Sequence, residues 1–143
     1  MGGKLLLLNG PNLNRLGKRE PGIYGSKTLS DVEKELSAAV EPFEYQIDAK
    51  QSNHEGQLID WIQESEGSYD GIIFNPGGYT HTSVAIRDAI SSVTVPVIEV
   101  HISNVHQREA FRHTSMLAPV CEGQIVGLGT KGYFLAAKYF IEN

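Results

Sequence analysis

Short apolar runs alternate with helical patterns along the 143 residues of this chain, and that alternation constrains its fold more than any other feature. The pattern predicts five strands, at residues 4–8, 43–49, 71–74, 97–101 and 124–127. It predicts helices at residues 28–40, from residue 53 onward, at 83–90 and at 130–142. Strands that alternate with helices favour a parallel sheet with helices on both faces. We therefore expect a single α/β domain over residues 1–143, with a flavodoxin-like, doubly wound, five-stranded parallel sheet.

Polar clusters mark the ends of three predicted strands. The first strand ends in residues 9–12, the third in residues 75–81 and the fourth in residues 99–103. In a doubly wound sheet, ligands bind beyond the carboxyl ends of the strands, where the strand order reverses. We expect all three clusters at one edge of the sheet, and the ligand site among them.

The composition excludes several classes of function. The formal net charge is −5 and there is no basic run, so nucleic acid is not an expected partner. The single cysteine, Cys121, excludes an internal disulfide and a cysteine-rich metal site, and we expect it to be a small core residue. The leucine run at residues 5–8 is too short for a signal peptide, and no segment approaches transmembrane length. These features predict a cytoplasmic protein without a membrane partner.

A long loop at residues 9–25 looks built to hold an anion. Loops of this length in small domains are usually lids or binding loops. Disorder fits poorly, because Leu13, Leu16, Ile23 and Tyr24 are interleaved with the polar residues.

The same loop carries a candidate general base. Tyrosine has a pKa near ~10, and a guanidinium such as that of Arg19 favours the phenolate and lowers this pKa. Tyr24 is therefore a plausible base. The alternative is that Tyr24 only anchors the loop by packing.

Glu99 and His101 lie two positions apart on a predicted strand, so their side chains share one face. A carboxylate beside an imidazole fixes its tautomer and supports its protonated form, which suits a general acid. A structural histidine is the second possibility. A metal site completed by His81 or His106 is the third.

Other polar groups at these strand ends suit binding. Gly77 and Gly78 lack Cβ atoms, so the backbone between Asn75 and His81 can approach a ligand closely. The N–H groups around Ser103 are plausible carboxylate donors.

Two further patterns are weaker. Arg108 and Arg112 share one face if their segment is helical. Residues 127–132 fit G-x-G-x-x-G, but the chain ends before the acidic residue that a dinucleotide site requires, so we predict only a tight turn there.

Taken together, the spaced motifs resemble the type II 3-dehydroquinate dehydratases over essentially the whole chain. The matching segments are residues 9–14, 19–21 with 24–25, 75–77 with 79–83, 99–104, and 108–109 with 111–112. The family's fold is flavodoxin-like, and it uses no metal or organic cofactor. The resemblance implies reversible dehydration of 3-dehydroquinate to 3-dehydroshikimate, in the shikimate pathway of aromatic amino acid biosynthesis or in quinate catabolism.

The resemblance implies a catalytic role for five residues. Tyr24 would take a proton from C2, with its pKa lowered by Arg19. Asn12 would stabilise the resulting enol or enolate, through a water. His101 would protonate the departing C1 hydroxyl while Glu99 holds the imidazole.

It also implies the residues that bind the substrate. They are Asn75, His81, Asp88, Ile102, Ser103 and Arg112, with Arg108 in support. Asn75 and the N–H groups of Ile102 and Ser103 would bind the carboxylate, and His81 and Arg112 the ring hydroxyls. Residues 16–25 would close over the substrate.

Asp88 would reach the site of a neighbouring subunit, in trimers that group into dodecamers, and Arg108 would supply positive charge near Tyr24. Departures from the family pattern at Ala110, Thr114 and Met116 leave these chemical groups intact but bear on the packing around Arg112 and on subunit contacts. We assign Arg15 no chemical role and expect it on the surface.

Overall fold

The carboxyl ends of five parallel strands form one edge of the molecule in this computed structural model. The structure describes residues 2–18 and 20–142, apart from the side chains of Pro21 and Tyr24. The strands are β1 (Gly3–Asn9), β2 (Tyr45–Gln51), β3 (Gly71–Asn75), β4 (Val97–His101) and β5 (Gly123–Val126). Their order, β2-β1-β3-β4-β5, is the flavodoxin-like order and confirms the predicted topology.

The leucine run in β1 packs against helices on both faces of the sheet. Successive strand residues point to opposite faces. Leu5 and Leu7 accordingly belong to one buried cluster, and Leu6 and Leu8 to another. A strand covered on both faces is apolar throughout instead of alternating, which explains the continuous run.

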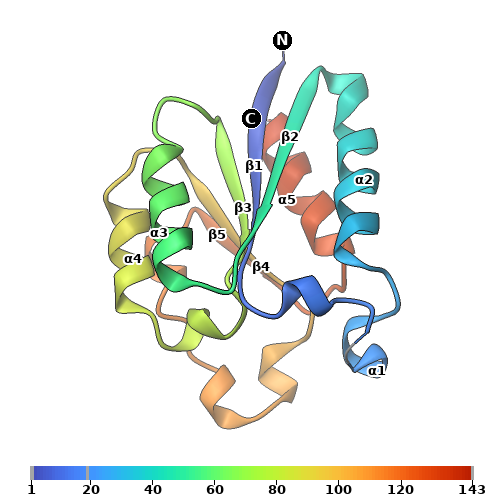
Figure 1. The fold of residues 1–143 in the computed structure, drawn as a ribbon, viewed down its shortest axis with the longest axis vertical. Coiled ribbons are helices and arrows are strands. Elements are labelled where there is room, and N and C mark those ends of the chain that lie inside the picture. Colours follow the sequence, from blue (N-terminus) through green and yellow to red (C-terminus); the bar gives the residue numbers. More distant parts are fainter. Residues whose placement is uncertain (1, 19, 143) are drawn as a thin grey trace.

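Four long helices form the two outer layers (Figure 1). They are α2 (Leu29–Val40), α3 (Glu55–Glu64), α4 (Val84–Ser91) and α5 (Lys131–Glu142). The helices α2 and α5 cover the face of Leu5, and α3 and α4 cover the face of Leu6. Helix α2 begins with the predicted capping box, in which the side chains of Thr28 and Asp31 each accept the other's backbone N–H.

Most predicted elements are confirmed, with shifted bounds in two strands. β2 begins at Tyr45 and not at residue 43, because Pro42 lies in a short 3-10 turn and Glu44 takes a left-handed conformation (φ +63°). β5 is displaced by one residue toward the N-terminus. Helix α3 begins after His54, two residues later than predicted.

The predicted loop at residues 9–25 contains two short helical pieces, a 3-10 turn at Leu13–Arg15 and α1 (Pro21–Tyr24). Leu13 and Leu16 are buried in the core, whereas Ile23 is exposed. The loop is therefore attached to the domain through its first half.

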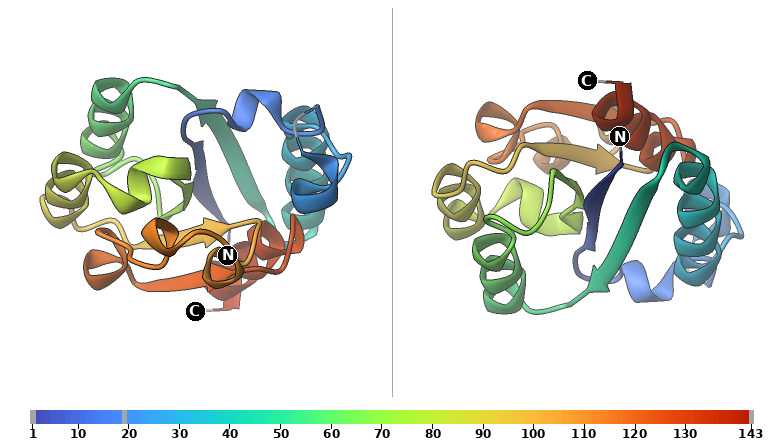
Figure 2. Two further views of the ribbon diagram at one scale, coloured as in Figure 1. Left: turned by 90° about the horizontal axis from the view of Figure 1, so that it is seen from below. Right: turned by 90° about the horizontal axis from the view of Figure 1, so that it is seen from above.

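All the long connections at the carboxyl edge lie together. Seen from below in Figure 2, the loop after β1, the turn after β3 and residues 105–120 surround the ends of the strands. In the described part of the chain, no helix is long and apolar enough to cross a membrane.

Candidate active site

A cleft of about 200 Å³ lies at the carboxyl edge, beside the switch point between β1 and β3. It is lined by residues from the loops after β1, β3 and β4. Eight predicted site residues line it: Asn12, Asn75, His81, His101, Ile102, Ser103, Arg108 and Arg112. The sheet thus collects residues that are far apart in the sequence, as the strand-end rule predicts.

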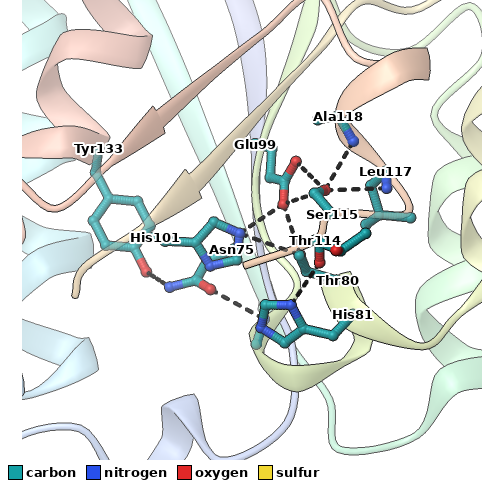
Figure 3. Close-up of polar contacts among 11 residues, drawn as sticks. Asn75, Thr80, His81, Glu99, His101, Thr114, Ser115, Leu117, Ala118 and Tyr133 are labelled. Atoms are coloured by element: carbon teal, nitrogen blue, oxygen red, sulfur yellow. Dashed lines mark hydrogen bonds and ion pairs between the residues drawn. The ribbon is translucent and has the colours of Figure 1, made fainter. Parts of the chain in front are cut away.

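Glu99 and His101 form a buried pair (Figure 3), in which His101 lines the cleft and Glu99 lies behind it. His101 Nε2 lies 2.6 Å from Glu99 Oε2. Because a carboxylate only accepts, Nε2 carries a proton and the ring is anchored in one tautomer. The predicted pairing on one strand face is confirmed, and it leaves Nδ1 on the other side of the ring.

Two hydroxyl groups complete the surroundings of Glu99. Thr80 Oγ donates to Glu99 Oε2 at 2.8 Å, and Ser115 Oγ donates to both carboxylate oxygens at 2.9 and 3.0 Å. Ser115 Oγ also accepts the N–H groups of Leu117 and Ala118. Glu99 is therefore a fully buried carboxylate held by three donors.

These contacts determine the ionisation of Glu99. Burial on its own would raise the pKa of this carboxyl group. Its hydrogen bond with His101, the charge of His101, and the hydrogen bonds from Thr80 and Ser115 outweigh burial and lower the pKa below its ordinary value. Glu99 thus stays ionised beside the imidazole.

His81 faces the same cleft with a defined tautomer. Its Nδ1 lies 2.8 Å from the carbonyl oxygen of Thr114 and therefore carries a proton. In the neutral ring, Nε2 is then free to accept. The rings of His81 and His101 stack with centroids 6.3 Å apart. Two imidazoles can therefore contact one ligand.

The turn after β4 offers backbone donors. In the described part of the chain, the N–H groups of Ile102 and Ser103 donate to no backbone acceptor. The peptide is fixed from behind, since the N–H of Gly127 donates to His101 O (3.1 Å) and that of Gly129 to Ile102 O (3.0 Å). Pre-positioned N–H groups of this kind suit a carboxylate.

The turn after β5 thus has a structural use. Residues 127–132 form the predicted tight turn, with positive φ at Gly127 and Gly129. It supports the turn after β4 by backbone hydrogen bonds.

At the switch point the loops after β1 and β3 touch through their backbones. A Cβ on Gly10 would lie 2.6 Å from Pro76 O, and Gly77 combines a positive φ with close contact to Pro11. The absence of a Cβ at Gly77 therefore allows the two loops to pack together. A Cβ on Gly78 would instead meet open space beside the cleft.

Asn12 sits in this contact region in a left-handed conformation (φ +72°). Its N–H donates to the side-chain oxygen of Asn53 at 3.0 Å. A non-glycine residue with positive φ is uncommon and often marks a functional position.

Asn75 is anchored on both sides of its amide. Its Nδ2 donates to the Tyr133 hydroxyl at 2.9 Å, and its Oδ1 accepts from the Gly77 N–H at 3.1 Å. The Tyr133 hydroxyl in turn donates to Asn9 Oδ1 at 2.6 Å.

The two arginines at the cleft share one carboxylate. Arg112 Nε lies 2.8 Å from Glu109 Oε1, and Arg108 Nε lies 3.9 Å from the same atom. Arg108 also donates to Ser103 Oγ at 3.3 Å. The condition for a shared helical face is not met, because the segment contains 3-10 turns at Val105–Gln107 and Ala110–Arg112, separated by extended backbone at Arg108. Both side chains nevertheless reach the cleft.

Of the other predicted residues, Asp88 does not line the cleft. Asp88 is exposed on α4. Arg19 lies outside the described residues, and only the backbone of Tyr24 is described, as the last residue of α1. Arg15 is exposed, as expected.

Sequence reasoning missed Thr80, Ser115, Tyr133 and Asn9 as parts of the site. Thr80 and Asn9 lie within the family motifs at residues 79–83 and 9–14, and the motifs alone imply no role for either. Ser115 and Tyr133 lie 16 and 58 positions from their partners Glu99 and Asn75, so no local pattern identifies them.

Groups of three or more His, Cys, Asp or Glu side chains arranged to hold a metal do not occur among the described residues. Cys121 is partly buried and packs against the core, and burial raises the pKa of its thiol to about 12. It is therefore a packing residue, as predicted.

Comparison with known proteins agrees with this geometry. The family model described as Dehydroquinase class II matches residues 3–141. Curated relatives include the 3-dehydroquinate dehydratases of Bacillus pumilus (62% identity, covering 96% of this chain and 94% of the relative) and Halalkalibacterium halodurans (62% identity, 97% and 96%).

Solved structures give the same result. The type II dehydroquinase from Propionibacterium acnes superposes with a TM-score of 0.95 at 38% identity, covering 98% of this chain and 97% of the other. That from Butyrivibrio crossotus gives 0.94 at 50% identity, covering 96% of both chains. This chain belongs to the class II dehydroquinase family.

Proposed function

We propose that this protein is a 3-dehydroquinate dehydratase, which removes water from 3-dehydroquinate to give 3-dehydroshikimate through an enol or enolate. The observation that carries the proposal is the buried Glu99–His101 pair, whose histidine lines a cleft with backbone donors and two arginines. An acid that donates into an anion-binding cleft is what loss of a hydroxyl from a carboxylate substrate requires.

Elimination begins with loss of a proton from C2, next to the ketone. Tyr24 takes this proton as phenolate, and Arg19 lowers its pKa. The electron pair moves onto the ketone oxygen, where Asn12 stabilises the negative charge through a water. The support for Asn12 is its place in the cleft and its constrained backbone.

Departure of the C1 hydroxyl completes the reaction. His101, doubly protonated, donates its Nδ1 proton to the leaving oxygen, so that water departs and the C1–C2 double bond forms. Glu99 supports this role because its lowered pKa keeps a negative charge beside Nε2. Thr80 and Ser115 hold the carboxylate in place.

Binding uses the remaining residues of the cleft. Asn75 and the N–H groups of Ile102 and Ser103 bind the carboxylate. His81 and Arg112 bind ring hydroxyls, and Arg108 adds positive charge near Tyr24. Residues 16–25 close over the substrate and exclude water.

Several broader assignments belong to the same proposal. The protein acts as a single catalytic domain without a cofactor, in the cytoplasm, in aromatic amino acid biosynthesis or quinate catabolism. It assembles as a dodecamer of four trimers, in which Asp88 reaches the cleft of a neighbouring subunit. Exposure of Asp88 on α4 supports this reach.

The function is tested by incubating the purified protein with 3-dehydroquinate and following the enone absorbance of the product. We expect absorbance to rise at neutral pH and turnover to survive treatment with a chelator. Folded protein that gives no product at any pH from about 6 to 9, the range in which a tuned base and acid operate, rejects the function. Activity lost on chelation and restored by a metal favours the metal site at His81 and His101. Binding of substrate without turnover favours a non-catalytic module.

The acid and base are tested by Tyr24→Phe and His101→Ala. Both variants should lose at least about 10²-fold in kcat, the contribution typical of general acid–base catalysis, while circular dichroism shows a folded protein. Near-normal kcat in Tyr24→Phe means that another group takes the proton. Tyr69→Phe is the matched control, because its hydroxyl bonds Asp48 and not a residue of the cleft.

A further inference from the structure

A buried chain of hydrogen bonds runs beneath the cleft. It joins Asn75 at the end of β3, Tyr133 in α5 and Asn9 at the end of β1. Asn9 and Tyr133 are fully buried and Asn75 is 4% exposed. Three polar side chains so deep in the core require a reason, since apolar residues would fill the same space without the cost of desolvation.

The direction of the chain follows from its distances. Tyr133 Oη lies 2.6 Å from Asn9 Oδ1, a separation typical of O–H···O and too short for N–H···O. The tyrosine hydroxyl therefore donates its only proton to Asn9 Oδ1. Its lone pair accepts from Asn75 Nδ2 at 2.9 Å, an ordinary N–H···O distance. Burial raises the pKa of Tyr133, so the hydroxyl stays protonated.

This direction fixes the orientation of the Asn75 amide. In a flipped amide, Oδ1 would face a hydroxyl whose proton is already used, and the NH₂ group would face the Gly77 N–H that Oδ1 now accepts. The flip is therefore opposed at both ends. One Nδ2–H bonds Tyr133, and the second remains for a ligand in the cleft that Asn75 lines (Figure 3).

We propose that Tyr133 is a positioning residue, whose hydroxyl holds the Asn75 amide so that it presents an N–H, and not its oxygen, to the substrate carboxylate. The proposal rests on the proposed function, which assigns that carboxylate to Asn75. It also accounts for Asn9, which accepts the Tyr133 proton although its own Nδ2 is buried without a partner in the described part of the chain.

Kinetics of Tyr133→Phe test the proposal. The variant keeps the ring but frees the Asn75 amide, so a hydrogen bond to a charged group is lost. We expect KM for 3-dehydroquinate to rise roughly tenfold or more, and kcat to change by less than about threefold, because the carboxylate is bound equally in the ground and transition states.

Tyr69→Phe is the control, because it also removes one tyrosine hydroxyl, bonded to Asp48 on β2. It should lower stability without changing KM. If KM in Tyr133→Phe rises no more than in this control, or if kcat falls while KM is unchanged, Tyr133 does not position Asn75.

A second measurement tests the proposal even if Tyr133→Phe does not fold or the wild type does not convert 3-dehydroquinate. In ¹⁵N-asparagine-labelled wild type, the Asn75 side-chain amide should exchange slowly with solvent and shift on adding quinate, which has the carboxylate but no ketone. Exchange as fast as that of the exposed Asn53 amide overturns the proposal. Protected, quinate-sensitive signals in a protein without dehydratase activity leave the positioning role intact and reject only the proposed reaction.

Discussion

Glu99 is the residue at which burial and charge oppose each other most directly. It is fully buried, yet its hydrogen bonds with His101, Thr80 and Ser115 keep the pKa below its ordinary value. A carboxyl group whose pKa is lower in the folded than in the unfolded state stabilises the fold above the unfolded pKa. That stability is lost as the pH falls through the folded pKa.

The consequence is a measurable loss of unfolding free energy at acid pH. The unfolding free energy of wild type should decrease as the pH falls below about 4.5, the ordinary pKa of a glutamate. This decrease should be steeper in wild type than in Glu99→Gln. The two slopes should differ by up to ~1.4 kcal/mol per pH unit, which is the value for the uptake of one proton. At neutral pH, Glu99→Gln should be less stable by about 1–3 kcal/mol, because buried donors lose a charged acceptor. Denaturant unfolding between about pH 3 and 7 measures both effects.

The control for this experiment is Glu35→Gln, which removes an exposed ion pair with Lys27. Exposed ion pairs contribute little to stability, so Glu35→Gln should lose unfolding free energy at acid pH as steeply as wild type does. Equal slopes in wild type and Glu99→Gln would mean that Glu99 is not ionised in the folded protein.

The elements most accurately predicted from sequence are those buried on both faces. The run Leu5–Leu8 has no polar alternation, and its strand matches the prediction closely. β2 is half exposed, so its pattern is weaker and Pro42 and Glu44 decide where it begins. Residues 105–121 contain three short 3-10 turns joined by irregular backbone, and no periodicity in the sequence predicts them.

The site residues likewise divide into those that the sequence predicts and those that it does not. Residues at strand ends, such as Asn75 and His101, could be predicted because parallel strands end at one edge. Thr80, Ser115 and Tyr133 could not, because their roles depend on contacts between elements distant in sequence.

The turn after β5 provides a prediction at the scale of elements. Gly127 has φ +87°, and a Cβ there would lie 3.0 Å from Asn104 Cβ, next to the turn after β4 that offers the proposed carboxylate donors. Gly129 has φ +63° but open space around its Cβ. Both Gly→Ala substitutions should cost about 1–2 kcal/mol in unfolding free energy, the strain of a left-handed residue.

Only Gly127→Ala should also raise KM for 3-dehydroquinate, because it displaces Asn104 and with it the N–H groups of Ile102 and Ser103. The comparison requires denaturant unfolding and steady-state kinetics of both variants. If the two variants show the same KM, the turn after β5 supports stability but not binding.

At the scale of the whole molecule, charge is distributed unevenly. The chain carries a net charge of −5, yet two of its five arginines, Arg108 and Arg112, line the cleft. Cationic side chains gathered in one cleft of an acidic protein attract an anionic substrate locally. Asp88 lies on the exposed surface of α4 beside Val84, which is 53% exposed. Exposure at this position is what the proposed role of Asp88 across a contact between subunits requires.

Subunit complementation tests this role of Asp88. Asp88→Ala and His101→Ala should each lower activity when purified alone. If Asp88 serves a neighbouring subunit, mixed assemblies refolded from equal amounts should regain activity in about a quarter of their sites, those that combine His101 of one subunit with Asp88 of another. If Asp88 serves its own subunit, every site lacks one group and mixing restores nothing. Light scattering on the wild type measures the assembly directly, and a monomer that is fully active contradicts any role for Asp88 across subunits.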